Sequence, residues 1–564
     1  MSTAIARLEP AHARPAAGGP GAAAVLRALV RQRLRRDRWQ LTVWLLSIAA
    51  LAAFSAASVQ QTYASAAGRD QVIRLAISDP TILVLRGLPQ GSTLPALIFF
   101  EIFTFLALMA GLMNTFLAVR HSRAEEESGR AELVASTPAG RLLPTAATVV
   151  YAVLVDVALA IITSLGFLAT GLPAGGSFVA GAAVGGAGLA FFGVGLLLAQ
   201  VMSTSRGANG YAAAVVIAAY LLRGIGDAMG TPIGDGTHLR AAWPSWLSPI
   251  GWGEQTAAWT ADAWWPILLQ VGFAAVLVVG VFGLQAVRDS GAGLVPERAG
   301  RATASPTLSG AVGLAWRLQR PVVIGWTVGG ALGGLLAGAL GSAINSSLAS
   351  NPDLAGIREA MRRIGAGGSG PLTELFISAI LSIVGVLAAA CAVQSVVRLR
   401  QEEQSGTAEV MLATPLSRVR WLFSHVGVGV VAVLAVLLAA ALTAGLSAIA
   451  AGEDTSMIGH AFAAASAQAP VALVYLGALT LLFVLLPSWT VPVGWAALGL
   501  GAFVGIFGGL IQLPDWIRHL SPFADAPVVV GDVDWTGGYW MLGITIAALG
   551  AAAGLIRRRD FAIG

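Results

Sequence analysis

Residues 123–141 read RAEEESGRAELVASTPAGR, and residues 400–418 read RQEEQSGTAEVMLATPLSR. The two stretches align without a gap at an offset of 277 positions, and ten of the nineteen aligned residues are identical. Polar loops between membrane spans normally tolerate substitution, because a solvated side chain has few fixed neighbours. A charged loop that is kept alike in two halves of one chain therefore predicts a contact that is made twice, with a two-fold partner.

The composition of the chain is typical of a protein with many membrane spans. Apolar residues make up 56% of the 564 residues and charged residues only 11%, which sets the chain apart from soluble domains. An apolar run needs roughly 20 residues to cross a bilayer as a helix. The predicted fold is an all-α integral membrane protein with about twelve transmembrane helices. The predicted spans are residues 39–58, 95–118, 143–171, 176–203, 209–227, 266–286, 322–347, 372–396, 421–450, 463–486, 492–512 and 539–556.

Other repeated motifs divide the chain into two parallel six-span halves. A Leu-Ser-Pro triplet precedes span six at 247–249 and span twelve at 520–522, and Arg-Asp follows each of these spans at 288–289 and 559–560. Repeats of the same orientation imply an even number of spans in each half and an axis along the membrane normal. The predicted organisation is a disordered tail (1–25), a first half with an interfacial helix (26–287), a cytoplasmic linker (288–316) and a second half (317–564).

Arginines predict the orientation of the chain in the membrane. Five arginines lie between Arg31 and Arg38, just before the first span, and three more at 557–559 follow the last. Positive charge favours the cytoplasmic side, so both termini are expected to be cytoplasmic in a multi-pass protein of the bacterial cytoplasmic membrane. Residues 26–39 suit a short helix in the cytoplasmic interface. Residues 314–320 suit a weaker copy, which Pro321 is expected to end.

Each acidic loop is expected to form a short cytoplasmic helix. In the first copy Glu125 and Glu132 are seven residues apart and share a helical face, while Glu126 and Arg130 have the spacing of a supporting ion pair. A simpler interpretation is a solvated loop whose charges keep it out of the membrane, but the gapless second copy disfavours it. Gln404 replaces the third glutamate there, so that position is not required by what the two copies share.

The pattern R-x-E-E-x-S-G-x-A-E-[LV]-x-x-x-T-P-x-x-R between the second and third span resembles the permeases of ABC-2-type (type V) exporters. More narrowly, it is similar to the double-length actinobacterial permeases known as exporters of polyketide antibiotics, the tetronasin-resistance group. The six-span halves and the Leu-Ser-Pro segments fit the same family. The resemblance implies that the acidic loops are coupling helices that dock on separate ATPase subunits, and that the Leu-Ser-Pro regions are extracellular re-entrant elements.

Carried over by position, the resemblance assigns docking to ten residues. They are Glu125, Glu126, Gly129, Glu132 and Pro138 in the first copy, and Glu402, Glu403, Gly406, Glu409 and Pro415 in the second. The substitution at Gln404 leaves open an asymmetry between the two docking sites.

The chain itself cannot supply the usual ATP site. It contains no lysine, so the phosphate-binding motif G-x-x-x-x-G-K-[ST] cannot occur. We therefore expect no enzymatic activity, no cofactor and no metal site in this chain, with ATP and Mg²⁺ bound by the partner subunits. The predicted protein is the permease of an ATP-driven exporter of hydrophobic or amphipathic compounds, such as antibiotics. Its expected partners are two copies of an ATPase subunit, the lipid bilayer and the cargo, with no nucleic acid.

Glu101, Asp156 and Glu374 are acidic residues that lie inside predicted spans. Such groups are costly in a membrane and are usually functional or paired. They are candidates for the substrate path, as contacts for a cationic or hydroxyl-bearing substrate or as a proton site. The structural alternative is that each one makes a hydrogen bond between helices.

Two other functions are compatible with parts of the sequence. A proton-coupled secondary transporter can also have two parallel six-span halves, although the loop after the second span lacks that family's Gly-x-x-x-Asp-Arg-x-Gly-Arg-Arg pattern. A membrane platform that only assembles an ATPase would differ by lacking cargo-stimulated ATP hydrolysis. An intramembrane enzyme is disfavoured, because neither H-E-x-x-H nor G-x-S-x-G occurs.

Overall fold

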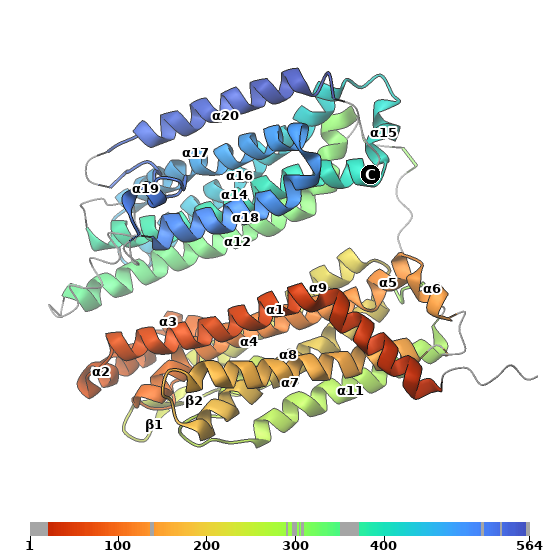
Figure 1. Ribbon diagram of the computed structural model, residues 1–564. Helices are drawn as coiled ribbons and strands as arrows, with labels where there is room; N and C mark the ends of the chain where they lie inside the picture. The colour runs from red at the N-terminus through yellow and green to blue at the C-terminus, as the bar shows by residue number, and fades with distance from the viewer. Residues whose placement is uncertain are drawn as a thin grey trace, which may run out of the picture. The chain divides into compact units, whose positions relative to one another are not determined.

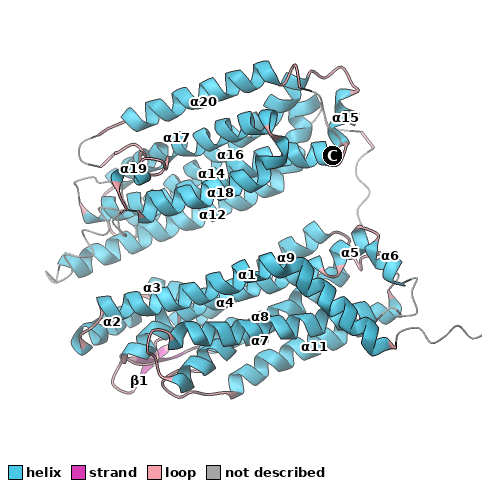
Figure 2. Ribbon diagram, viewed as in Figure 1, coloured by secondary structure: helices cyan, strands magenta, loops and turns pink. Residues whose placement is uncertain are grey.

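The computed structural model describes residues 21–559, except 136–139, 141, 289–290, 296–301, 304, 306–309, 350–370, 509–512 and 531–532. Helices make up nearly all of the described secondary structure (Figure 2). Twelve of the described helices are long and apolar enough to cross a membrane. This confirms the predicted all-α membrane fold with twelve spans. The chain forms two compact units, Met1–Ala299 and Gly300–Gly564, and each is described by itself.

The first unit is a bundle of six long helices with short elements at its ends (Figure 1). Its elements are α1 (Ala22–Thr62), α2 (Ala66–Ser78), α3 (Pro80–Arg86), α4 (Leu94–Arg120), α5 (Arg123–Glu127), α6 (Arg130–Ala135), α7 (Leu143–Leu168), α8 (Ala174–Val201), α9 (Ser205–Ala228), β1 (Thr231–Ile233), β2 (His238–Arg240), η1 (Trp243–Leu247), α10 (Pro249–Glu254) and α11 (Trp265–Val287).

Helices α4 and α8 form the buried centre of the first unit, and α8 packs against α4, α7 and α11. Glycines on α8 allow this close approach. A Cβ atom at Gly181 would lie 2.1 Å from Ser164 Oγ, and one at Gly185 would lie 2.8 Å from the Asp156 carbonyl oxygen. Small residues let helix backbones come together where lipid supplies no hydrophobic driving force, so the glycine-rich sequence of α8 is explained by packing.

Helix α1 is longer than a single membrane span. Its 41 residues correspond to about 60 Å, twice the thickness of the hydrocarbon core. The N-terminal part of α1 runs at an angle to the rest of the helix (Figure 1), as suits a segment that leaves the bundle along the interface. The helix begins at Ala22, so the end of the predicted disordered tail is in fact helical; residues 1–20 of that tail lie outside the described residues.

Several short elements of the first unit were not predicted. Helices α2 and α3 follow the first span, and a hairpin pairs β1 with β2 in antiparallel register, with Pro232 opposite Leu239. The first Leu-Ser-Pro triplet starts α10, where the Ser248 hydroxyl accepts a hydrogen bond from the Ile250 N–H at 3.2 Å. Helix α10 is buried and packs against α4, α8, α9 and α11, so it is folded back into the bundle.

The second unit repeats the order of the long helices (Figure 1). Its elements are α12 (Gly310–Ala349), α14 (Leu372–Gln404), α15 (Thr407–Leu412), α16 (Arg418–Ala450), α17 (Ser456–Leu485), η4 (Pro487–Trp489), α18 (Thr490–Ala502), η5 (Phe503–Phe507), α19 (Asp515–Arg518) and α20 (Thr536–Leu555).

Two details of the second unit differ from the sequence prediction. Helix α12 starts at Gly310, inside the predicted linker, and it continues through Pro321, which was expected to end it. Proline removes one backbone hydrogen bond and normally disrupts a helix interior. Helix α12 packs along both α14 and α16, and this tertiary packing outweighs the local cost.

Candidate functional site

Both acidic loops fold as two helical segments joined by a left-handed glycine. In the first unit α5 and α6 are joined across Gly129, which has φ +70°. In the second unit α14 runs without a break to Gln404, and Gly406 with φ +72° joins it to α15. Side chains with a Cβ rarely adopt this conformation. The repeated glycine is therefore explained by the turn that each loop requires.

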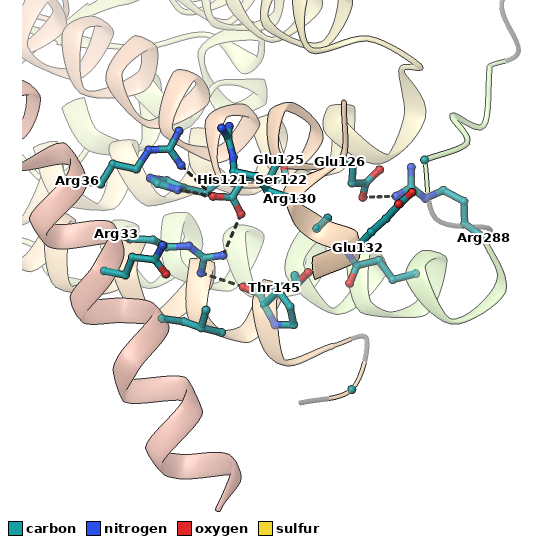
Figure 3. A pocket seen from close by; sticks show the side chains of 17 residues that line it. Arg33, Arg36, His121, Ser122, Glu125, Glu126, Arg130, Glu132, Thr145 and Arg288 are labelled. Carbon is teal, nitrogen blue, oxygen red and sulfur yellow. Dashed lines mark hydrogen bonds and ion pairs between the residues drawn. The ribbon is translucent and has the colours of Figure 1, made fainter. Parts of the chain in front are cut away.

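The second glutamate of each loop forms an ion pair with an arginine that follows the last span of the same unit. Glu126 pairs with Arg288 at 2.6 Å and with Arg123 at 2.8 Å, and Figure 3 shows the Arg288 contact. Glu403 likewise pairs with Arg559, and with Arg400 at 3.1 Å. These two contacts, Glu126–Arg288 and Glu403–Arg559, are called the clasps below. They explain why the acidic loop and the Arg-Asp motif are repeated together.

The first glutamate of the first loop holds the loop to α1. Glu125 lies 3.3 Å from Arg36, 3.7 Å from Arg33 and 3.7 Å from His121 Nδ1 (Figure 3). Arg33 also donates a hydrogen bond to the Pro144 carbonyl oxygen at 2.9 Å. The contacts join the N-terminal part of α1, the loop and the start of α7.

The first glutamate of the second loop contacts α16 and its own helix, α14. Glu402 lies 3.2 Å from His425 Nε2 and 3.4 Å from Arg398, and it accepts a hydrogen bond from Trp421 Nε1 at 3.3 Å. Each loop therefore places its first glutamate against a buried histidine. The histidines come from different places in the chain, because His121 precedes the first loop and His425 lies in α16.

The two loops differ in the contacts that their third acidic position makes. Glu127 accepts hydrogen bonds from the backbone N–H and the hydroxyl of Ser205, both at 2.5 Å, at the start of α9. Glu127 and the equivalent Gln404 are both exposed, so the contact with Ser205 rather than burial distinguishes the first loop. The first loop is thus tied to three neighbouring elements and the second to fewer.

Exposure divides the predicted docking residues into two groups. Glu402 and Glu403 are only 3% and 5% exposed, and Glu125 and Glu126 are partly buried in their ion pairs. The carboxylates that are open to solvent are Glu132 on α6 and Glu409 on α15, and Pro415 is also exposed. Gly129 and Gly406 shape the turns, and Pro138 lies outside the described residues.

A cavity of about 190 Å³ lies beside the first acidic loop (Figure 3). Residues of α1, α5, α6, the start of α7 and the end of α11 line it, and most of their polar atoms belong to arginines and glutamates. In the second unit the hollow beside α15 is lined by residues between Glu409 and Arg418. The two loops therefore present different surroundings to a partner.

Sequence reasoning missed a buried network next to the first loop. Asp37 contacts His121, accepts a hydrogen bond from the Tyr151 hydroxyl at 2.9 Å and pairs with Arg120 at 2.9 Å. It joins α1, α4 and α7. The sequence feature that could have revealed this network is Asp37, the one acidic residue among the five arginines that precede the first span.

The three substrate-path candidates all have partners within their own units. Glu101 pairs with Arg86 of α3, and Glu374 lies 3.2 Å from His460. Asp156 is buried and accepts a hydrogen bond from Asn114 Nδ2 at 2.8 Å. The contacts match the structural alternative, in which these groups join elements of the bundle. A role in the substrate path stays a prediction.

A second buried cluster fixes α10 to the first unit and was not predicted. Arg223 lies 3.1 Å from Asp227 and 3.5 Å from Glu254, and it donates hydrogen bonds to two carbonyl oxygens of α3. Glu254 also accepts a hydrogen bond from Thr104 at 2.8 Å. Burial raises the pKa of Glu254 well above its usual value, and the neighbouring Asp227 carboxylate raises this pKa further.

Comparison with known proteins agrees with this architecture. The chain is 36% identical over 521 residues to the multidrug efflux system permease protein Rv1217c of Mycobacterium tuberculosis, and the match covers 90% of each chain. Residues 308–559 match the family described as the C-terminal domain of the multidrug efflux system permease Rv1217c. That match begins two residues before α12 and ends at Arg559, so it spans the second unit up to its clasp.

Proposed function

The chain belongs to the family of multidrug efflux system permeases, and on that premise we propose that it is the membrane subunit of an ATP-driven exporter of the ABC-2 type. In this proposal separate subunits bind ATP and Mg²⁺, and the permease carries hydrophobic or amphipathic compounds across the cytoplasmic membrane. We place the chain more narrowly with the double-length antibiotic exporters of the tetronasin-resistance group. Both termini and both acidic loops lie on the cytoplasmic side.

The observation that supports this proposal best is the pair of clasps. A loop that only keeps charge out of the membrane needs no fixed partner, but here each loop is tied to the arginine that follows the last span of its unit. In the first unit the loop is also tied to α1, so a displacement of that loop would move the first and last elements of the bundle together. In the second unit the corresponding contacts are with α16 and with the arginine that follows α20. This is the connection that a motor-driven permease needs between its docking surface and its helices.

The exposed residues of the loops are the proposed contact with the motor. Glu132 and Glu409 occupy equivalent places in the first turns of α6 and α15 and are open to solvent. The more buried glutamates contribute to docking indirectly, because their ion pairs hold the loops in place. They are Glu125, Glu126, Glu402 and Glu403. Two such surfaces would receive two copies of one ATPase subunit.

The test is a pull-down of the tagged permease from its native membrane, followed by an ATPase assay. We expect an ATPase subunit to co-purify at two copies per permease, and Glu132→Arg/Glu409→Arg to lose it. The matched control is Asp235→Arg/Asp515→Arg, which makes the same charge change at two exposed acidic residues on the side predicted to be extracellular. Retention of the motor by the Glu132/Glu409 variant, or equal loss in the control, would refute docking at these residues.

A proton-coupled transporter is the second candidate, and Asp156 is the observation that favours it. Its carboxyl is buried, and within the described residues only one of its two oxygens has a hydrogen-bond partner. A proton gradient that drives transport in vesicles without ATP, and that fails in Asp156→Asn, would support this function over the first.

A further inference from the structure

Four arginines form an exposed line along the N-terminal part of α1. Arg27, Arg31, Arg35 and Arg38, called the arginine stripe below, are separated by four, four and three residues, which places them on one side of a helix. All four are exposed. Within the described part of the chain, no carboxylate lies within ion-pair distance of their guanidinium groups. The charge of the stripe is therefore not neutralised by the protein that surrounds it.

A different side of the same segment packs into the first unit. Val30, Arg33, Asp37 and Leu41 are buried, and Arg33 and Asp37 make the ion pairs and hydrogen bonds described above. The orientation of the segment about its axis is thus fixed by its buried side. The stripe has to face away from the bundle.

The exposed side of α1 continues from the stripe into a surface suited to lipid. Trp39, Val43, Leu46 and Phe54 follow on this side, with exposed fractions between 57% and 72%. Large apolar side chains that are exposed on a membrane span face acyl chains, and tryptophan is enriched at the boundary with the headgroups. The Arg38 guanidinium lies 5.5 Å from the centroid of the Trp39 ring. Arginine, tryptophan and then aliphatic residues therefore follow the order of headgroup, boundary and hydrocarbon.

We propose that the arginine stripe is a binding surface for the anionic headgroups of phospholipids in the cytoplasmic leaflet. Arginine suits this ligand because its guanidinium can donate two parallel hydrogen bonds to a phosphate. A row of four positive charges at the depth of the headgroups attracts an anionic lipid more than a zwitterionic one. The attraction should weaken as salt screens the charges.

The second unit carries a shorter version of the same surface. On α12 the exposed arginines Arg317 and Arg320 precede the exposed residues Ile324 and Val328. The second unit has two exposed arginines on this surface and the first unit has four, so the preference for anionic lipid should come mainly from the first unit. This difference supplies a control within the chain.

Lipid bound to the arginine stripe would also stabilise the position of the first acidic loop. This effect on coupling rests on the proposed function. Arg33 and Arg36, which hold Glu125, lie on the same turns of α1 as Arg31, Arg35 and Arg38. A lipid that fixes this segment from outside would fix the position of the loop. Coupled ATP hydrolysis should then increase with the fraction of anionic lipid.

The test measures lipid contact directly, without any ATPase. Full-length permease is reconstituted in phosphatidylcholine vesicles that contain spin-labelled phosphatidylglycerol or spin-labelled phosphatidylcholine. Electron paramagnetic resonance then gives the fraction of each lipid immobilised on the protein. We expect the wild type to prefer phosphatidylglycerol, and Arg27→Gln/Arg31→Gln/Arg35→Gln/Arg38→Gln to reduce that preference about twofold or more.

Two further variants separate the stripe from general positive charge. Arg317→Gln/Arg320→Gln/Arg557→Gln/Arg558→Gln removes the same number of exposed arginines and should keep most of the preference. Replacement of the four stripe arginines by lysine keeps the charge and should keep most of the preference as well. Equal losses in the two glutamine variants would overturn the proposal. If the stripe variant fails to insert, a wild-type preference that is insensitive to salt would overturn it instead.

The functional step has its own readout. A stripe variant that loses the lipid preference while the ATPase activity of its complex still rises with phosphatidylglycerol would overturn the link to the acidic loop alone. Failure of an ATPase to co-purify would overturn the proposed function and leave the lipid result intact.

Discussion

The two acidic loops share ten of nineteen residues, yet the structure holds them differently. In the first loop Glu125, Glu126 and Glu127 reach α1, Arg288 and the start of α9. In the second loop the first two glutamates turn inward, and Gln404 is exposed. The common feature is the clasp. The comparison shows that the repeated residues tie each loop to its own unit, while the residues that differ set how firmly each loop is held.

The largest expected effect is the loss of the second clasp. Glu403→Ala would remove the carboxylate that pairs with Arg559 and Arg400, at a site where Glu403 is 5% exposed. Breaking a buried ion pair on one side costs about 3–5 kcal/mol. Thermal unfolding of the purified permease should show the loss, and the charge-reversed pair Glu403→Arg/Arg559→Glu should recover part of it. A Glu403→Ala protein as stable as the wild type would show that the clasp does not stabilise the second unit.

A smaller effect is expected at the end of the first unit that carries α10, where the sequences of the two units also differ. Glu254→Ala removes the partner of Thr104 and one of the two carboxylates beside Arg223, at a cost of about 2 kcal/mol. Pro527 occupies the equivalent position of the second half. Because the folded protein raises the pKa of Glu254, its carboxyl is favoured in the protonated form.

The sign of the pH dependence follows from that shift. Protons bind more tightly to folded than to unfolded protein at Glu254, so this residue's contribution to stability decreases as pH rises above its ordinary pKa. Glu254→Gln mimics the protonated form, and its unfolding temperature should fall less than that of the wild type over this range. Parallel pH profiles for the two proteins would contradict the assignment.

The first clasp should cost less to break than the second. Glu126→Ala leaves Arg123 with three backbone carbonyl acceptors, those of Ala199, Gly291 and Ala292. The side chain of Glu126 is also 15% exposed, against 3% for Glu403. We expect a loss of about 1–2 kcal/mol in the same unfolding assay. A larger loss than for Glu403→Ala would reverse the comparison between the two loops.

The smallest effect is expected at the third position of the loops. Glu127→Gln weakens the contact with Ser205 and should lower the unfolding temperature by less than about 3 °C. Gln404→Glu restores the sequence identity but meets no equivalent of that contact, so it should leave stability unchanged. A stabilising Gln404→Glu would show that the second loop has a partner at this position.

The fold was largely predictable because the bilayer imposes one strong constraint. A helix that crosses it needs about twenty apolar residues, and each predicted run overlaps one of the twelve candidate membrane helices. Helices α1 and α12 begin well before their predicted spans, at Ala22 and Gly310 instead of residues 39 and 322. Helices α2 and α3 and the β1–β2 hairpin lack such a run and were missed. The continuation of α12 through Pro321 could not be predicted, because it depends on packing against α14 and α16 rather than on local sequence.

The candidate site was predictable in part. The repeat identified the loops, but each was expected to form one short helix with Glu125 and Glu132 on the same face in the first copy. Instead a left-handed glycine, Gly129 or Gly406, divides each loop. The clasps were not predicted, although both motifs were noticed, because Glu126 and Arg288 are 162 residues apart and only the fold brings them together. The buried histidines at the first glutamates come from unrelated positions, so no repeat could reveal them.

Site-directed crosslinking tests the central claim most directly. Cys391 is the only cysteine and is buried, so single cysteines can replace Glu132 or Glu409 in a Cys391→Ala background and be joined to the co-purified ATPase by a short crosslinker. The account predicts a crosslink to an ATPase subunit from each position, and none from a cysteine at exposed Asp515. Crosslinks from neither loop, or from one loop only, would contradict two docking surfaces on one permease.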